Sequence, residues 1–336
     1  RDRSVSRGLG DVYKRQEYPY HNEVCLGCKH FCVFFIYFSY NSCYNVQNDR
    51  KGGGIPMENR TRRTIGLILA NASSSFTTAF MDLFQQELYQ KDYKLVIGLT
   101  NHDLEKERFY LEFFGRTTEG IIILSDSSEY KELADAIAPN IPVVFIHRAP
   151  ADCEHTSIIE SDYSATFQAV LSLVNSGYPK TALICRNIKF STSREIIQAY
   201  RAAMETTPEG FHEDWIFECN TTDRDYIENL TSHITGKGCT GLLAASIEVT
   251  ERLAPYIYEY NKLHDAPLSL TGFSTENRST VLFKSLDTIC RPIHRTVDLA
   301  LQQLFYLMSN PDAPQNEYIV KGSLKMRTSD VFQTLS

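Results

Sequence analysis

The sequence predicts an α/β protein in which parallel sheets are flanked by helices, and three observations support this. From residue 64 onward, short runs rich in Ile, Leu and Val alternate with amphipathic stretches of about 12 to 18 residues. Hydrophobic residues make up 43% of the 336 residues and charged residues 22%, as in ordinary globular proteins. No apolar run approaches the roughly 20 residues needed to cross a bilayer. The composition excludes disordered and fibrous classes of protein, and because no long apolar run is present, no membrane contact is expected.

The expected strands are short apolar runs, which suit burial on both faces of a sheet. They are residues 64–69, 94–99, 120–124, 142–146, 181–185, 240–245 and 267–273. The expected crossover helices place apolar residues at three- and four-residue spacing. They are residues 76–89, 104–114, 165–174, 193–204, 249–260 and 293–308. Ligands of open parallel sheets bind beyond the carboxyl ends of the strands, so we expect a site in the loops that follow these strands.

Residues 1–56 do not share this pattern and show no sustained helical or strand period. Residues 5–16 (VSRGLGDVYKRQ) resemble translated adapter or assembly sequence, so we interpret 1–56 as an aberrant leader, non-native or disordered, with Met57 as the native start. A zinc site is an alternative for this leader, because thiolates and imidazole at short spacing can bind zinc. Its ligands would come from Cys25, Cys28, His30, Cys32 and Cys43. No second well-spaced CxxC pair is present, so we expect no metal.

Charge is unevenly distributed along the chain. Residues 1–63 contain 11 Lys and Arg against 6 Asp and Glu, whereas the remaining residues contain 23 against 35. Affinity for DNA comes largely from neutralisation of phosphates by Lys and Arg. The acidic body is therefore a poor surface for nucleic acid, and any contact with DNA must come from elsewhere.

Several segments, taken in order, resemble the LacI/GalR (lac-repressor) family of transcription regulators. They include residues 62–69 (RRTIGLIL), 73–76 (SSSF), 104–108 (LEKER), 119–123 (EGIII), 141–148 (IPVVFIHR), 176–178 (SGY), 200–204 (YRAAM), 270–273 (LTGF) and 286–292 (LDTICRP). None of these is specific alone, but their order and intervals match the family's ligand domain.

The resemblance implies the type I periplasmic-binding-protein fold, with two lobes that clamp a small-molecule effector, a sugar or related metabolite, in a cytoplasmic homodimer. It places residues 64–161 and 292–317 in the N-terminal lobe, and residues 162–291 and 318–331 in the C-terminal lobe. Residues 57–63 would be a remnant of the hinge and 332–336 a tail. The chain would cross between the lobes near residues 160–162, 288–292 and 316–320. Closure on the effector would then change the affinity of the dimer for operator DNA.

The chain also departs from the family's pattern. No helix-turn-helix is recognisable in residues 1–60, so operator binding is expected only if the full gene encodes a headpiece. Ile247 and Ser274 stand where the family has acids that grip sugar hydroxyls, and Ile196 stands where it has an arginine. These losses favour a less hydroxylated ligand or a degenerate pocket, because each lost partner costs on the order of 1 to 3 kcal/mol.

The candidate ligand-binding residues lie at the predicted strand ends. They are Ser73, Phe76, Asn101, Asp126, Arg148, Arg194, Asn220, Ser246 and Ser274. Structural roles compete with this assignment. The serines could be helix N-caps, Phe76 could be core, and Arg148 and Arg194 could be in surface ion pairs.

No enzyme motif is present: GxSxG, HExxH, GxxxxGK[ST] and a GxGxxG after a strand are all missing from the sequence. We therefore expect no catalytic residue and no cofactor. The alternative function is a solute-binding protein of a sugar-type ABC transporter, which shares the fold but needs an export signal.

Overall fold

The structure is a computed structural model. It describes residues 63–125, 130, 133, 135–137, 140–148, 154–189, 191–219, 222–276 and 286–326, all within one compact unit. The predicted leader with its zinc alternative and the candidates Asp126 and Asn220 lie outside these residues. Within the described part of the chain, no helix is long and apolar enough to cross a membrane.

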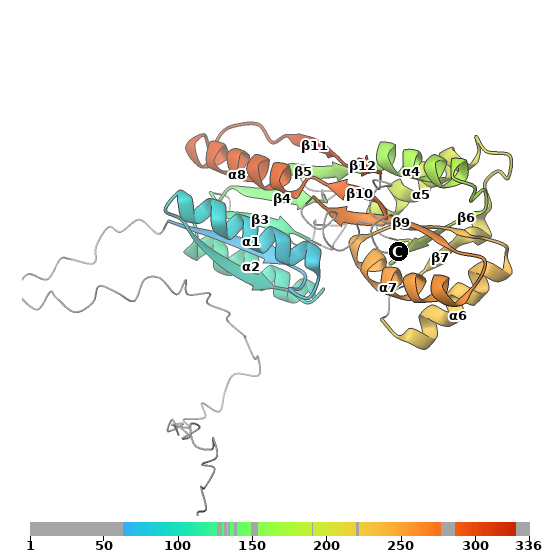
Figure 1. Ribbon diagram of the computed structural model, residues 1–336. Helices are drawn as coiled ribbons and strands as arrows, with labels where there is room; N and C mark the ends of the chain where they lie inside the picture. The colour runs from blue at the N-terminus through green and yellow to red at the C-terminus, as the bar shows by residue number, and fades with distance from the viewer. Residues whose placement is uncertain are drawn as a thin grey trace, which may run out of the picture. The chain divides into compact units, whose positions relative to one another are not determined.

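The first lobe is a six-stranded parallel sheet with the strand order β11-β5-β4-β3-β1-β2 (Figure 1). Its strands are β1 (Thr64–Leu69), β2 (Lys94–Leu99), β3 (Gly120–Leu124), β4 (Val143–His147), β5 (Thr156–Ser161) and β11 (Glu317–Lys321). Its helices are α1 (Ser75–Gln90), α2 (Leu104–Thr117) and α8 (Ile293–Ser309).

Successive residues of β1 point to opposite faces of the sheet, and both faces are covered. Leu67 belongs to the same buried cluster as Phe80 of α1 and Leu304 of α8. Ile68 points the other way, into a second cluster with Phe114 of α2. Burial on both faces explains why the central strands are continuous apolar runs rather than alternating ones.

The second lobe has the strand order β12-β10-β9-β8-β6-β7, parallel except for the antiparallel pair of β12 with β10. Its strands are β6 (Thr181–Cys185), β7 (Ile216–Glu218), β8 (Gly241–Ala244), β9 (Ser269–Thr275), β10 (Asp287–Arg291) and β12 (Ser323–Lys325). Its helices are α4 (Tyr163–Asn175), α5 (Ser191–Met204), α6 (Arg224–Gly236) and α7 (Ile247–Leu263), with a short 3-10 turn at Glu213–Trp215. Helices α4 and α5 cover one face, and α6 and α7 the other (Figure 1).

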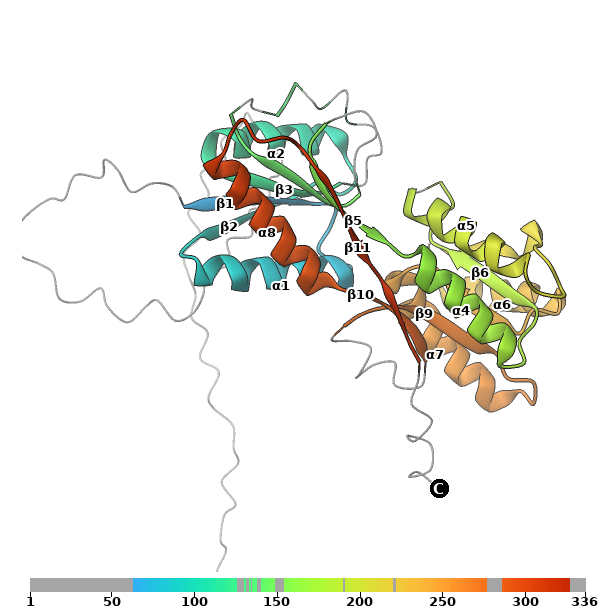
Figure 2. The ribbon, with the colours of Figure 1, turned by 90° about the horizontal axis from the view of Figure 1, so that it is seen from above.

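Three connections join the lobes and run side by side (Figure 2). Strand β5 leads through Asp162 into α4, β10 leads through Pro292 into α8, and β11 leads through Gly322 into β12. A side chain at Gly322 would not fit, because its Cβ would lie 2.5 Å from Oδ1 of Asp162 in the neighbouring connection. The connections are therefore packed against one another at their midpoints.

The α/β class with two sheets flanked by helices is confirmed, but several details differ from the sequence predictions. Strand β11 pairs with β5 through residues 317–321, so the third crossing lies at residue 322 and not at 316–320. Residues 318–321 therefore extend the first sheet, although the sequence placed them in the second lobe. Helix α6 was not predicted, because it buries little more than Ile227, Thr231 and Ile234.

Candidate functional site

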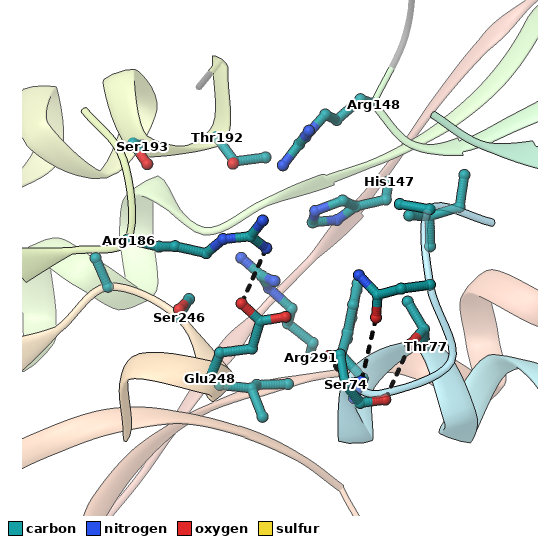
Figure 3. Close-up of a pocket in the computed structure, with 16 residues that line it drawn as sticks. Ser74, Thr77, His147, Arg148, Arg186, Thr192, Ser193, Ser246, Glu248 and Arg291 are labelled. Carbon is teal, nitrogen blue, oxygen red and sulfur yellow. Dashed lines mark hydrogen bonds and ion pairs between the residues drawn. The ribbon is translucent and has the colours of Figure 1, made fainter. Parts of the chain in front are cut away.

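A pocket lies where the carboxyl ends of the two sheets face each other, and both lobes line it (Figure 3). First-lobe residues in its lining are Ala70, Asn71, Ser74, Phe76, Thr77, Leu124, His147 and Arg148. Second-lobe residues in its lining are Arg186, Thr192, Ser193, Ala245, Ser246, Ile247, Glu248 and Arg291. Strand ends and helix starts supply nearly all of these residues, as expected for a parallel sheet.

The loop between β1 and α1 forms one wall and is held by its own polar side chains. The Asn71 Oδ1 accepts hydrogen bonds from the Ser73 and Ser74 backbone N–H groups, at 3.1 and 3.3 Å. The Ser74 Oγ in turn accepts from the Phe76 N–H at 3.2 Å and so caps α1. This local network fixes the position of the Phe76 ring at the pocket edge.

His147 ends β4 and lies between the pocket and the interior. Its φ is +71°, a left-handed conformation that costs energy for a residue with a Cβ and often occurs at functional sites. Its ring packs against Phe76 with centroids 4.9 Å apart. Its Nδ1 donates to Oε2 of Glu160 at 2.9 Å, since a carboxylate can only accept. Burial, together with the nearby charges of Arg291 and Arg148, lowers the pKa of His147 despite the opposing effect of Glu160, so the imidazole is neutral near pH 7.

A buried charge network lies beneath the pocket, where the connections between the lobes meet. Arg291, at the end of β10, donates from Nε and Nη2 to Oδ2 of Asp162 at 2.9 and 2.7 Å. Its Nε also lies 3.7 Å from Oε2 of Glu160. Burial disfavours the Arg291 charge, but Asp162 and Glu160 outweigh burial and raise its pKa. The guanidinium carbon lies 5.4 and 4.9 Å from the ring centroids of Phe76 and Phe273, one from each lobe.

The carboxyl of Glu160 is charged in this environment. Burial alone would raise its pKa, but His147, Arg291 and the Thr296 hydroxyl stabilise the carboxylate and lower the pKa. The network therefore links a pocket residue, His147, to the residues that join the lobes.

On the second-lobe side, an ion pair and a helix start line the pocket. The Arg186 Nη1 donates to Oε2 of Glu248 at 2.9 Å (Figure 3). The Ser246 Oγ accepts from the Val249 N–H at 3.2 Å and caps α7. One turn further along α7, Oε1 of Glu251 accepts a hydrogen bond from the Ser75 hydroxyl at 2.6 Å. This last bond joins the lobes directly, next to the pocket.

The structure brings three of the predicted candidates to the pocket, namely Phe76, Arg148 and Ser246. Four others lie away from its lining. Ser73 and Asn101 are in exposed loops, Arg194 is on the exposed side of α5, and Ser274 is fully buried within β9. The structure also shows where two of the residues that differ from the family's pattern lie. Ile247 lines the pocket, whereas Ile196 is buried in the core of the second lobe.

Sequence reasoning missed most of the polar lining. The polar residues that it did not select are Asn71, Ser74, Thr77, His147, Arg186, Thr192, Ser193, Glu248 and Arg291. Most of them lie in the loops after the predicted strands. The sequence therefore indicated the correct loops, but it did not indicate which side chains in them face the pocket. Arg291 lies outside those loops, because the strand that it ends, residues 287–291, was not predicted.

A two-lobed fold with a polar pocket between the strand ends defines a clamp-type binding domain. Residues 62–238, more than half of the chain, match the family "Periplasmic binding proteins and sugar binding domain of LacI family". The chain belongs to this family.

Curated relatives and solved structures agree with this membership. The ribose operon repressor of Haemophilus influenzae is 21% identical over 272 residues, covering 80% of this chain and 82% of the relative. The repressor PurR of Vibrio vulnificus is 27% identical over 168 residues, which cover 48% of this chain and half of the relative. The structure of a LacI family transcriptional regulator from Enterococcus faecium with bound ribose has a TM-score of 0.68 at 16% identity and covers 79% of this chain and 98% of its own.

The two curated relatives are named as repressors, and neither name is that of an enzyme. Their names also favour the effector-sensing domain of a LacI-family regulator over the solute-binding protein of a transporter.

Proposed function

We propose that the two lobes clamp a small-molecule effector, a sugar or a related metabolite, in the pocket between them and signal its presence by closing. The observation that supports this most is the lining itself, which comes from both lobes. A ligand that contacts both lobes binds the closed arrangement more tightly than the open one and so shifts the population toward it. The crossings at residues 162, 292 and 322 are where such a motion would hinge.

We further propose that the chain acts as a homodimer in the cytoplasm and controls an operator through a DNA-binding headpiece. Family membership and the repressor relatives support this proposal, one relative being a helix-turn-helix type. The body of the chain contains 35 acidic against 23 basic residues after residue 63, which suits a sensing domain better than a surface for phosphates. Sequencing the intact locus tests this part: a helix-turn-helix coded upstream of residue 57 supports it, and a cleavable export signal opposes it.

A thermal-shift screen tests the binding proposal with sugars, nucleosides and amino acids, including their phosphorylated and carboxylated forms. A ligand at 100 times its dissociation constant should stabilise the protein by about 2.7 kcal/mol. Phe76→Leu should weaken the hit, because Phe76 lines the pocket. Phe80→Leu is the matched control, since Phe80 lies one turn further along α1 and is buried away from the lining. Equal loss of binding in both variants, or no hit in the screen, would contradict the proposal.

A further inference from the structure

The first lobe contains a second cavity, at the end of its sheet where the strands begin. Its volume is about 940 Å³, within the range of about 300 to 1,000 Å³ that is usual for small-molecule sites. Residues next to the starts of β3, β4 and β5 line it, together with the ends of α2 and α8. The pocket between the lobes lies at the other end of these strands, so the two sites are separate.

The walls of this cavity are held in place by the fold. Leu307 and Val143 belong to the two buried clusters that cover opposite faces of the first sheet. Near β5, Oε1 of Gln315 accepts hydrogen bonds from the N–H and the hydroxyl of Thr156, each at 2.8 Å. The cavity is therefore preformed within one lobe and does not depend on how far the two lobes close.

Part of the cavity wall is apolar and still open to solvent. Ile137, Ile141 and Met308 line the cavity and are only half-buried. Covering apolar surface of this kind contributes about 25 cal/mol per Å². An apolar ligand body would cover these side chains, whereas the hydroxyl groups of a sugar would find few partners on them.

The charges at the cavity favour a cation. Among the lining residues that the structure describes, Glu119 and Asp312 are acidic and none is a lysine or an arginine. Burial lowers the pKa of His155, so this lining residue adds no positive charge near pH 7. Helix α8 ends at the cavity with no basic residue in its last turn, and the C-terminus of a helix carries roughly half a negative charge. Helix α2 also ends there, but Arg116 in its last turn offsets that charge.

The neighbours of Glu119 leave its negative charge in place. The Tyr93 hydroxyl hydrogen-bonds to the Glu119 side chain, and a phenol carries no charge near pH 7. Arg63 lies over the Tyr93 ring, 5.9 Å from its centroid, but it pairs with Asp92 at 3.2 Å and does not line the cavity. A ligand cation in the cavity would therefore meet a charged carboxylate.

We propose that this cavity binds an organic amine, with the ammonium group near Glu119 and Asp312 and the apolar body against Ile141 and Met308. An ammonium group donates charge-assisted hydrogen bonds to carboxylates. A carboxylate or phosphate would instead meet two acids and the end of α8. The inference goes beyond the proposed function, because it adds a second ligand with a different chemistry at a second site.

The position of the cavity gives such a ligand a means of regulation. The Glu119 N–H donates to the Thr64 carbonyl oxygen at 2.8 Å, so the chain enters the first lobe next to the cavity. The amine would thus bind beside the point at which any preceding segment joins the lobe. Strand β4 runs from Val143 at the cavity to His147 at the pocket between the lobes, so one strand connects the two sites.

The test is isothermal titration calorimetry on the full chain with compounds that share a ring and differ in charge. They are tryptamine, its alcohol tryptophol and its acid indole-3-acetate, and 2-phenylethylamine with 2-phenylethanol. We expect at least one amine to bind about fivefold or more tightly than its alcohol, since a partly exposed ion pair contributes up to about 1 kcal/mol. Indole-3-acetate should bind most weakly of the indoles.

Three variants test the acids with the amine that binds best. Glu119→Gln and Asp312→Asn should each weaken the amine by about two- to fivefold and leave its alcohol unchanged. Asp312→Lys should reverse the preference, so that indole-3-acetate binds more tightly than tryptamine. Glu112→Gln is the matched control, because it removes the same charge from an exposed position of α2 outside the lining.

The contrary results are distinct from failure of the clamp between the lobes. Alcohols that bind as tightly as their amines, or no binding by either amine, would overturn the inference. Equal effects of Glu119→Gln and Glu112→Gln would also overturn it, because the amine would then respond only to net charge. A loss of amine binding in Phe76→Leu as large as in Asp312→Asn would place the amine between the lobes and not in this cavity.

Discussion

Arg291→Met tests the charge network beneath the pocket, because it removes one charge and keeps most of the side-chain length. The Arg291 side chain is 5% exposed and that of Asp162 is 3% exposed. The substitution therefore leaves Asp162 and Glu160 buried without their cation. Removing one partner of a buried ion pair typically costs about 3 to 5 kcal/mol. For a chain of this size each kcal/mol lowers the melting temperature by about 2 to 4 °C, so we expect a drop of roughly 6 to 20 °C.

Differential scanning calorimetry measures this drop. Arg224→Met is the control, since it breaks an ion pair whose side chains are 70% and 54% exposed, and such pairs contribute about 0 to 1 kcal/mol. The double variant Arg291→Met with Asp162→Asn should recover part of the loss, because it removes one stranded carboxylate. A drop no larger than that of Arg224→Met would show that the network does not stabilise the connections between the lobes.

Three further substitutions test separate parts of the structure. In His147→Gln, stability should change less between about pH 6.5 and 5 than in the natural chain. Burial lowers the pKa of His147 in the folded protein. The stability that the neutral imidazole contributes is therefore complete above the unfolded pKa of 6.5 and is lost as pH falls. Melting curves across this pH range measure the loss. Gly66→Ala should cost about 1 to 3 kcal/mol in urea unfolding, because a Cβ there would lie 2.5 Å from Phe114. Ser75→Ala removes the 2.6 Å bond to the Glu251 carboxylate and should shift the lobes toward the open arrangement by about tenfold or more, a change visible by single-molecule FRET.

Each of these expectations has a clear contrary result. An unchanged pH profile in His147→Gln would mean that this imidazole does not titrate with unfolding. A Gly66→Ala variant as stable as the natural chain would show that the α2 helix can move away from the sheet. Identical FRET distributions for Ser75→Ala and the natural chain would remove the interlobe role of Ser75.

The central strands were predictable because burial on both faces leaves an unmistakable apolar run, as in residues 120–124. Three strands that border the connections between the lobes were not. Strands β5, β10 and β11 have the sequences TSIIES, DTICR and EYIVK, in which polar residues reach the connections between the lobes or the sheet edge. These strands are polar because each leads into a connection between the two lobes. Sequence periodicity contains no signal for that position in the fold.

The sequence predicted the location of the site better than it predicted the residues that line it. Strand-end loops were the correct place to search, but a loop sequence does not show which side chain turns inward. Ser73 and Ser74 are neighbours with the same side chain, yet Ser74 caps α1 at the pocket and Ser73 is exposed. Arg291 could not be assigned because its partner Asp162 is 129 residues away in the sequence. Pairing at that separation is set by the fold and leaves no local pattern.

Hydrogen exchange measured by mass spectrometry tests most directly whether both lobes clamp one ligand. The protein is compared with and without a saturating amount of the compound that gives the largest thermal shift. Exchange should slow together in the first-lobe segment 70–77 and in the second-lobe segment 245–250, because both line the same pocket. Slowing in only one of the two segments, or in neither, would contradict the clamp.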